Sequence, residues 1–162
     1  MQVVSFTAIG HAETQYTELA NMPIQGSKVA DNQGVLVIHP DYAEGLADLD
    51  GFSHVYVLFH LHQCKQGALK VKPFLDNQLR GVFATRSPKR PNPIGLSILE
   101  IDRLEGNRIH VKGIDMLNGT PIIDIKPYIQ AFDCVQNTRD GWYEQGKDPL
   151  QTLSDDRFAL IL

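Results

Sequence analysis

The sequence contains few of the residues that stabilise small secreted or zinc-dependent scaffolds. Its 162 residues include only two cysteines, Cys64 and Cys134, which lie far apart and in no Cys-x-x-Cys pattern. A disulfide framework and a zinc ribbon are therefore excluded. A chain of this length buries about 70% of its unfolded surface without such cross-links, and its size is that of one domain.

Long apolar segments and a glycine-rich nucleotide loop are also missing. The longest apolar runs, such as Val55–Phe59, have five residues, whereas a membrane-spanning helix needs about 20. The N-terminus, Met1–Phe6, has no basic or apolar part of a secretory signal, so we expect a cytoplasmic protein without a membrane partner. No Gly-x-Gly occurs, which argues against a Rossmann-type nucleotide-binding fold.

The charges are unevenly distributed along the chain. The net charge is −4, from 15 basic and 19 acidic residues, which does not favour a nucleic-acid partner. The segment from Cys64 to Arg90 nevertheless holds seven basic residues and a single acid, Asp76. Such a segment is either a docking surface for phosphates or another anion, or a solvated lysine-rich loop, and charge alone leaves both interpretations open.

Short β-type runs separated by turn signals dominate the chain. We expect strands over Val3–Ile9, Gly34–Ile38, His54–His62, Gly81–Thr85, Leu96–Leu104, Arg108–Ile114 and Pro121–Ile125. Glu105–Asn107 is expected to form a three-residue hairpin loop, and Pro40–Leu49 a helix that ends at Gly51. The pattern predicts a mainly β protein, a compact antiparallel β-barrel with one or two short helices. We expect the barrel domain at 1–138 and a tail at 139–162 that packs on the domain or on a dimer partner.

Gly81–Ser97 is the segment with the clearest chemical signal. Three prolines fix φ along it, so the loop is stiff and loses little entropy on binding: Pro88, Pro91 and Pro93. Three cations within five residues suit a carboxylate or phosphate: Arg86, Lys89 and Arg90. Gly95 is expected to allow a tight turn into the next strand. A proline-stiffened connection with exposed charges is the alternative interpretation.

The second informative segment is Gly113–Tyr128. Asn118-Gly119 is a strong turn signal. Asp115 and Asn118 either bond to the local backbone, which is the simpler interpretation, or hold amine or hydroxyl groups of a ligand. Asp124 and Lys126 share one strand face and are expected to pair with each other.

Three histidines raise the question of a metal site. His54, His60 and His62 have the same parity on one predicted strand, so their side chains are expected on one face. A cupin-like metalloenzyme would use such a set. No acid follows closely, however, so we favour histidines that hydrogen-bond to the core or a cofactor, and we expect no metal.

The two segments resemble the TsaA/TrmO family of S-adenosylmethionine-dependent tRNA methyltransferases. Residues 81–95 match the family's Gly-Val-Phe-Ala-Thr-Arg-Ser-Pro-x-Arg-Pro-Asn-Pro-Ile-Gly, with Lys89 where an aromatic is common. Residues 115–128 match its Asp-x-x-Asp-Gly-Thr-Pro-x-x-Asp-Ile-Lys-Pro-Tyr, with Asn118 in place of an acid. The resemblance spans about Val4 to Phe132 and implies a barrel fold that differs from Rossmann-type methyltransferases.

The resemblance also implies a homodimer and a methyl transfer from S-adenosylmethionine to N6 of threonylcarbamoyl-adenosine in a tRNA anticodon loop. The positions that match cofactor contacts are Pro23, Ile24, Gln25, His62, Gln63, Arg86, Leu96, Asp115, Leu117, Asn118, Gly119 and Thr120. Arg86, Lys89 and Arg90 would face the carboxylate of the modified nucleoside or nearby phosphates. Candidate catalytic groups, which accept an N–H of the adenine amine, are Asn92 and Asp115.

Departures from the family pattern keep the acceptor open. His11-Ala12-Glu13 stands where the family often has Arg-Ser-Pro, and Ile24 replaces a frequent arginine. The extra C-terminal domain of longer bacterial members is not expected here. Because fewer cations predict a weaker grip on tRNA, a small-molecule acceptor or a non-catalytic S-adenosylmethionine-binding module are the alternatives.

Overall fold

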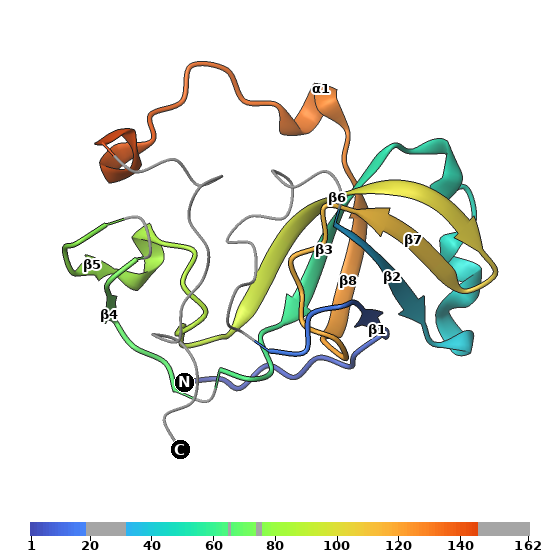
Figure 1. The fold of residues 1–162 in the computed structure, drawn as a ribbon, viewed down its shortest axis with the longest axis horizontal. Helices are drawn as coiled ribbons and strands as arrows, with labels where there is room; N and C mark the ends of the chain where they lie inside the picture. Colours follow the sequence, from blue (N-terminus) through green and yellow to red (C-terminus); the bar gives the residue numbers. More distant parts are fainter. Residues whose placement is uncertain (19–31, 65, 74–75, 146–162) are drawn as a thin grey trace.

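The computed structural model describes residues 1–18, 32–64, 66–73 and 76–145. Six strands form a closed antiparallel barrel in the order β1-β2-β7-β6-β3-β8 (Figure 1). Their bounds are β1 Gly10–Glu13, β2 Gln33–Ile38, β3 His54–His60, β6 Ile94–Glu105, β7 Arg108–Lys112 and β8 Pro121–Pro127. The mainly β barrel predicted from the strand pattern is confirmed.

A smaller part of the chain lies beside the barrel. The two-residue strands β4 (Lys70–Val71) and β5 (Arg80–Gly81) pair with each other, and the 3-10 turn η4 (Val82–Ala84) follows (Figure 1). We call residues 66–73 and 76–90 the side lobe. The other short helices are η2 (Pro40–Leu46), η3 (Leu49–Gly51), α1 (Gln130–Asp133) and η5 (Gly141–Gln145). No helix among the described residues is long and apolar enough to cross a bilayer.

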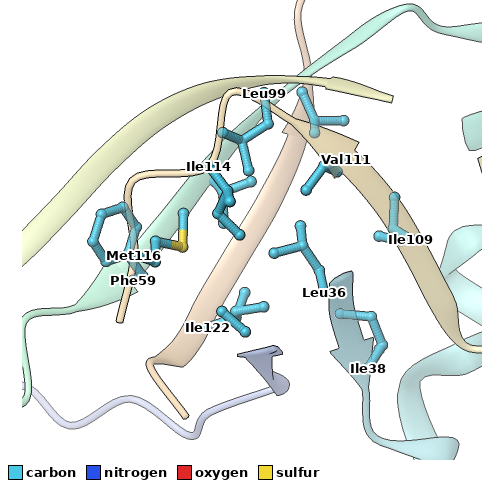
Figure 2. Packing of buried hydrophobic residues seen from close by; sticks show 12 residues of the cluster. Leu36, Ile38, Phe59, Leu99, Ile109, Val111, Ile114, Met116 and Ile122 are labelled. Carbon is cyan, nitrogen blue, oxygen red and sulfur yellow. The ribbon is translucent and has the colours of Figure 1, made fainter. Parts of the chain in front are cut away.

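The core fills the barrel because apolar residues alternate along the strands. On β7, Ile109 and Val111 are fully buried, while the residues on either side of each are only partly buried. β-strand side chains point alternately to opposite faces, so these two point inward. Figure 2 shows the buried cluster extending from Phe59 and Met116 at one end to Ile38 and Ile109 at the other. Each such aliphatic side chain contributes roughly 1.5–3 kcal/mol through burial.

The antiparallel order gives the barrel two chemically different ends. Strand β3 ends where β6 and β8 begin, because His60 pairs with Ile94 and Phe59 with Ile122. The proline-rich loop leads into β6 at this end, and the loop after β7 leads into β8. At the opposite end, β2 leads into η2 and η3 before β3 begins. We call these the motif end and the η2 end.

Several local predictions were wrong. Val3–Ile9 is not a strand, because the barrel hydrogen bonds begin at Ile9 and β1 at Gly10. Of Gly81–Thr85 only Gly81 is in a strand, because the Thr85 amide donates to the Val82 carbonyl and closes a 3-10 turn. The expected helix from Pro40 is two 3-10 segments, interrupted at Asp48, whose φ is 64°.

The β6–β7 hairpin loop is also shorter than predicted. Glu105 pairs with Arg108, so the loop has two residues, Gly106 and Asn107. Gly106 has a φ of 59°, a value that glycine adopts without strain. The other strand predictions, those on β2, β3, β6, β7 and β8, are confirmed to within a few residues at each end.

Candidate functional site

A cavity at the motif end brings the two sequence motifs together. Its volume is about 70 Å³. It is lined by Phe59, Leu61, His62, Gln63, Cys64, Pro88, Asp115, Met116, Leu117 and Thr120. Five of the predicted cofactor contacts are in this set: His62, Gln63, Asp115, Leu117 and Thr120. The structure therefore brings residues that are more than 50 positions apart in the sequence together around one cavity.

The first wall is the turn that follows β3. The His62 amide donates to the His60 carbonyl at 2.8 Å, and the Cys64 amide to the Leu61 carbonyl at 2.9 Å. The Leu61 amide donates to the carbonyl of Pro93 at 2.8 Å, which ties this turn to the end of the proline-rich loop. His62 and Gln63 thus line the cavity from a turn held on both sides by backbone hydrogen bonds.

Asp115 is held from inside the barrel. The Ser97 hydroxyl donates to Asp115 Oδ1 at 2.6 Å, and both residues are partly buried. Ser97 is an inward-facing position of β6, between Gly95 and Leu99. The resemblance did not point to it. The sequence could have indicated Ser97, because it lies two residues from Leu99 and so shares its strand face. A polar residue on an otherwise apolar strand face is unusual.

The loop after β7 contains both buried residues that line the cavity and exposed residues that form a turn. Leu117 and Thr120 are nearly buried and line the cavity. Asn118 and Gly119 are exposed, and the Asn118 Oδ1 accepts the Thr14 amide at 3.2 Å. The Gly119 amide donates to Ala12 O at 2.7 Å, with φ at 76°. The structure therefore uses Asn118-Gly119 as the local turn and does not place them among the lining residues.

Gly95 has a packing role that the sequence did not indicate. It lies within β6, opposite Phe59 on β3, and is not in a turn. An added Cβ would overlap the Phe59 ring, which lines the cavity. Glycine is therefore required here for close approach, and the expectation of a tight turn was wrong.

The proline-rich loop contributes only Pro88 to the described lining of the cavity. Arg90 Nη1 donates to the carbonyls of Thr85 at 2.7 Å and Val82 at 3.1 Å, so this side chain braces the loop. Arg86 is exposed and Lys89 is partly buried. Asn92 is also exposed. None of these four side chains lines the cavity.

Other predicted site residues are placed elsewhere. Leu96 points out of the barrel and is 58% exposed. Pro23, Ile24 and Gln25 lie outside the described residues, as does the tail from 146 to 162. Within the tail, the described Trp142 donates from Nε1 to the Ala84 carbonyl at 2.7 Å, so it packs on the side lobe.

The three histidines do not converge. The His54 ring contacts Ser53 Oγ and lies edge-on to Tyr128, His60 is exposed, and only His62 lines the cavity. The reason is that β3 ends at His60, so His62 no longer follows the strand parity. In the described part of the chain, no three His, Cys, Asp or Glu side chains lie close enough to hold a metal ion.

Cys64 is a cavity residue whose ionisation is shifted by its surroundings. Burial raises the pKa of the Cys64 thiol, and only weaker effects from the Gln66 carbonyl and Lys89 oppose this. The thiol is therefore protonated and a poor nucleophile at neutral pH. This argues against covalent catalysis by Cys64.

A larger groove of about 680 Å³ lies at the η2 end. It is lined by η2, η3 and the end of β8, with acidic residues Asp41, Glu44, Asp48 and Asp124. The Lys126 ammonium pairs with Asp124 at 2.7 Å, as the sequence predicted. None of the predicted site residues that the structure describes lines this groove, and its carboxylates would repel a nucleic acid. We therefore assign the site to the smaller cavity at the motif end.

Comparison with known proteins identifies the family of the chain. A model of the tRNA-methyltransferase O N-terminal domain matches residues 11–134, which include both motifs and the described cavity. A probable S-adenosyl-L-methionine-binding protein of Pyrococcus abyssi is 38% identical over 95% of this chain and 84% of its own length. A tRNA (adenine(37)-N6)-methyltransferase of Rattus norvegicus is 39% identical over 80% of this chain, but this covers only 32% of the rat protein.

Solved structures give the same result. The crystal structure of TrmO from Pseudomonas aeruginosa superposes with a TM-score of 0.74 at 34% identity, over 87% of this chain and 63% of that one. The chain thus spans somewhat less than two thirds of this neighbour. The family resemblance seen in the two motifs is confirmed, and the chain belongs to the family of tRNA-methyltransferase O N-terminal domains.

Proposed function

We propose that this protein is an S-adenosylmethionine-dependent methyltransferase that acts on the exocyclic N6 of an adenine in tRNA. The observation that carries the proposal is the cavity at the motif end, where both motifs of the family meet around Asp115 and Thr120. Relatives of this chain are named as S-adenosylmethionine-binding proteins and as tRNA adenine-N6 methyltransferases. The finer proposal is that the acceptor is threonylcarbamoyl-adenosine in the anticodon loop.

The residues that line the cavity fit part of S-adenosylmethionine. Phe59, Leu61 and Met116 form an apolar wall that suits a purine ring. The Asp115 carboxylate and the Thr120 hydroxyl suit ribose hydroxyls or the ammonium group. The cavity volume of about 70 Å³ is below the roughly 300 Å³ of a complete small-molecule site. We therefore propose that this cavity holds one portion of the cofactor.

The chain's own residues have a positioning role in this chemistry. When bound, S-adenosylmethionine supplies a methyl group that its sulfonium already activates. The protein must then align the acceptor nitrogen with that methyl group, and a fixed geometry contributes most of the acceleration. We propose that the Asn92 carboxamide accepts an N–H of the adenine amine from its stiff loop, while Asp115, braced by Ser97, orients the cofactor.

The partners follow from the surface around the site. Arg86, Lys89 and Arg90 are proposed to face the acceptor's carboxylate and neighbouring phosphates. We further propose a homodimer formed through the outer face of β6, because Ile94 and Leu96 are 37% and 58% exposed there. A cytoplasmic location is proposed because the substrate is a tRNA.

The proposal is tested with methyl-labelled S-adenosylmethionine and bulk bacterial tRNA, followed by digestion and separation of the nucleosides. Label in methylated threonylcarbamoyl-adenosine supports the full proposal. An Asp115→Ala variant should lose the label, whereas Asp124→Ala should keep it, because Asp124 lines the separate groove beside η2 and not the cavity. Bound cofactor without any labelled nucleoside would overturn the proposal in favour of a small-molecule acceptor or a non-catalytic binding module.

A further inference from the structure

The side lobe exposes more apolar surface than a solvated loop needs. Three large side chains lie on it with high exposure: Leu69 at 72%, Leu79 at 69% and Phe83 at 76%. Figure 1 shows this lobe, which contains β4 and β5, standing away from the barrel. An apolar cluster of this kind on a protein surface marks a contact with another molecule.

Phe83 is exposed but its backbone is fixed. It is the middle residue of η4, and the preceding Val82 is buried against Val71. The Val82 amide donates to Leu69 O at 3.0 Å, and the Thr85 hydroxyl donates to the Val82 carbonyl at 2.9 Å. On the other side, Trp142 Nε1 donates to the carbonyl of Ala84. A side chain on a backbone held in this way loses less entropy on binding than one on a flexible loop.

One cation lies over the Phe83 ring, and the side lobe carries several more. The Arg90 guanidinium lies 5.9 Å from the ring centroid, a cation–π distance. The carbonyls of Val82 and Thr85 hold Arg90 in this place. The lobe also carries Lys70, Lys72, Arg80, Arg86 and Lys89. Its one acid, Asp76, is paired with Arg80 at 2.6 Å, so the excess charge is positive.

We propose that Phe83 is a stacking platform for an unpaired nucleobase of an RNA loop, with the lobe's lysines and arginines neutralising its phosphates. Single-stranded RNA is recognised through bases stacked on exposed aromatic rings within cationic surfaces. A protein partner would also cover Phe83, but the centres of protein interfaces are depleted of charge. This proposal rests on the proposed function, because it names the surface that would hold the tRNA loop.

The test measures binding of an anticodon stem–loop RNA that carries 2-aminopurine in its loop, whose fluorescence falls on stacking. Phe83→Ala should bind about 5- to 140-fold more weakly and lose the quenching, since stacking of one base on an aromatic ring contributes about 1–3 kcal/mol. Phe83→Trp should bind within threefold of wild type, and Phe83→Leu should resemble the alanine variant. Phe132→Ala is the matched control, because Phe132 on α1 is 79% exposed.

Each outcome separates this proposal from the previous one. Equal RNA affinity and quenching for wild type and Phe83→Ala would overturn the stacking platform while leaving the proposed function intact. A change in sedimentation of Phe83→Ala, without RNA dependence, would show a protein interface and also overturn it. Failure of the wild type to bind the stem–loop would overturn the platform, and labelled methyl transfer in the same preparation decides the proposed function separately.

Discussion

Replacing Ser97 by alanine is expected to weaken S-adenosylmethionine binding by about 10- to 100-fold. The Ser97 hydroxyl donates to Asp115 Oδ1 at 2.6 Å from within β6, and Asp115 lines the cavity. A hydrogen bond to a charged group contributes about 1.5–3 kcal/mol. Since 1.4 kcal/mol is a factor of ten in Kd, the full loss of this bond corresponds to the range given.

The same substitution should leave the barrel folded. Part of the hydrogen-bond energy will be lost from stability instead of affinity, because the carboxylate of Asp115 can turn toward water. A loss of about 1 kcal/mol lowers Tm by roughly 2–4 °C in a chain of this size. The core residues next to Ser97 on the same face, Gly95 and Leu99, keep their contacts.

Titration calorimetry with S-adenosylmethionine measures the effect, with thermal unfolding of each variant as the check on folding. Ser53→Ala is the matched control, because the Ser53 hydroxyl contacts His54 Nδ1 at 2.9 Å at the η2 end, away from the cavity. A folded Ser97→Ala protein with wild-type affinity would refute the placement of the cofactor against Asp115.

Three further predictions concern the cavity and its loop. Gly95→Ala should reduce cofactor affinity at least tenfold, because the new Cβ displaces the Phe59 ring, and calorimetry that finds no change would contradict this. Bound cofactor should slow alkylation of Cys64 but not of exposed Cys134, and peptide mass spectrometry measures both sites. Because burial raises the pKa of the Cys64 thiol, its labelling should need a higher pH than that of an ordinary thiol. Arg86→Ala should abolish methyl transfer while leaving the fold intact, and a folded, fully active variant would exclude Arg86 from the site.

The strands were predictable where burial follows the two-residue period of a β-strand. Ile109 and Val111 on β7 are such positions, and the predicted strand is there. Val3–Ile9 has the same β-branched character, but the described part of the chain offers it no partner strand before Ile9. Intrinsic preference cannot decide such a case, because strand formation depends on the pairing that tertiary structure provides.

The candidate site, too, was predictable from the sequence only in part. His62, Asp115 and Thr120 followed from motifs, because each motif is contiguous in the sequence. The contacts that shape the cavity, Gly95 against Phe59 and Ser97 against Asp115, depend on the register between β3 and β6 and on the loop after β7. A shift of one residue would turn these side chains to the other face, and nothing local in the sequence specifies that register.

The distribution of charge explains how an acidic protein can hold a polyanion. The acids Asp41, Glu44 and Asp48 lie at the η2 end, whereas the excess positive charge lies on the side lobe, beyond the other end of β3. The seven residues of β3 extend over about 20 Å, which is more than twice the Debye length of about 8 Å at physiological salt. Carboxylates at the η2 end are therefore largely screened from an RNA on the lobe, and the local charge, not the net value of −4, governs its binding.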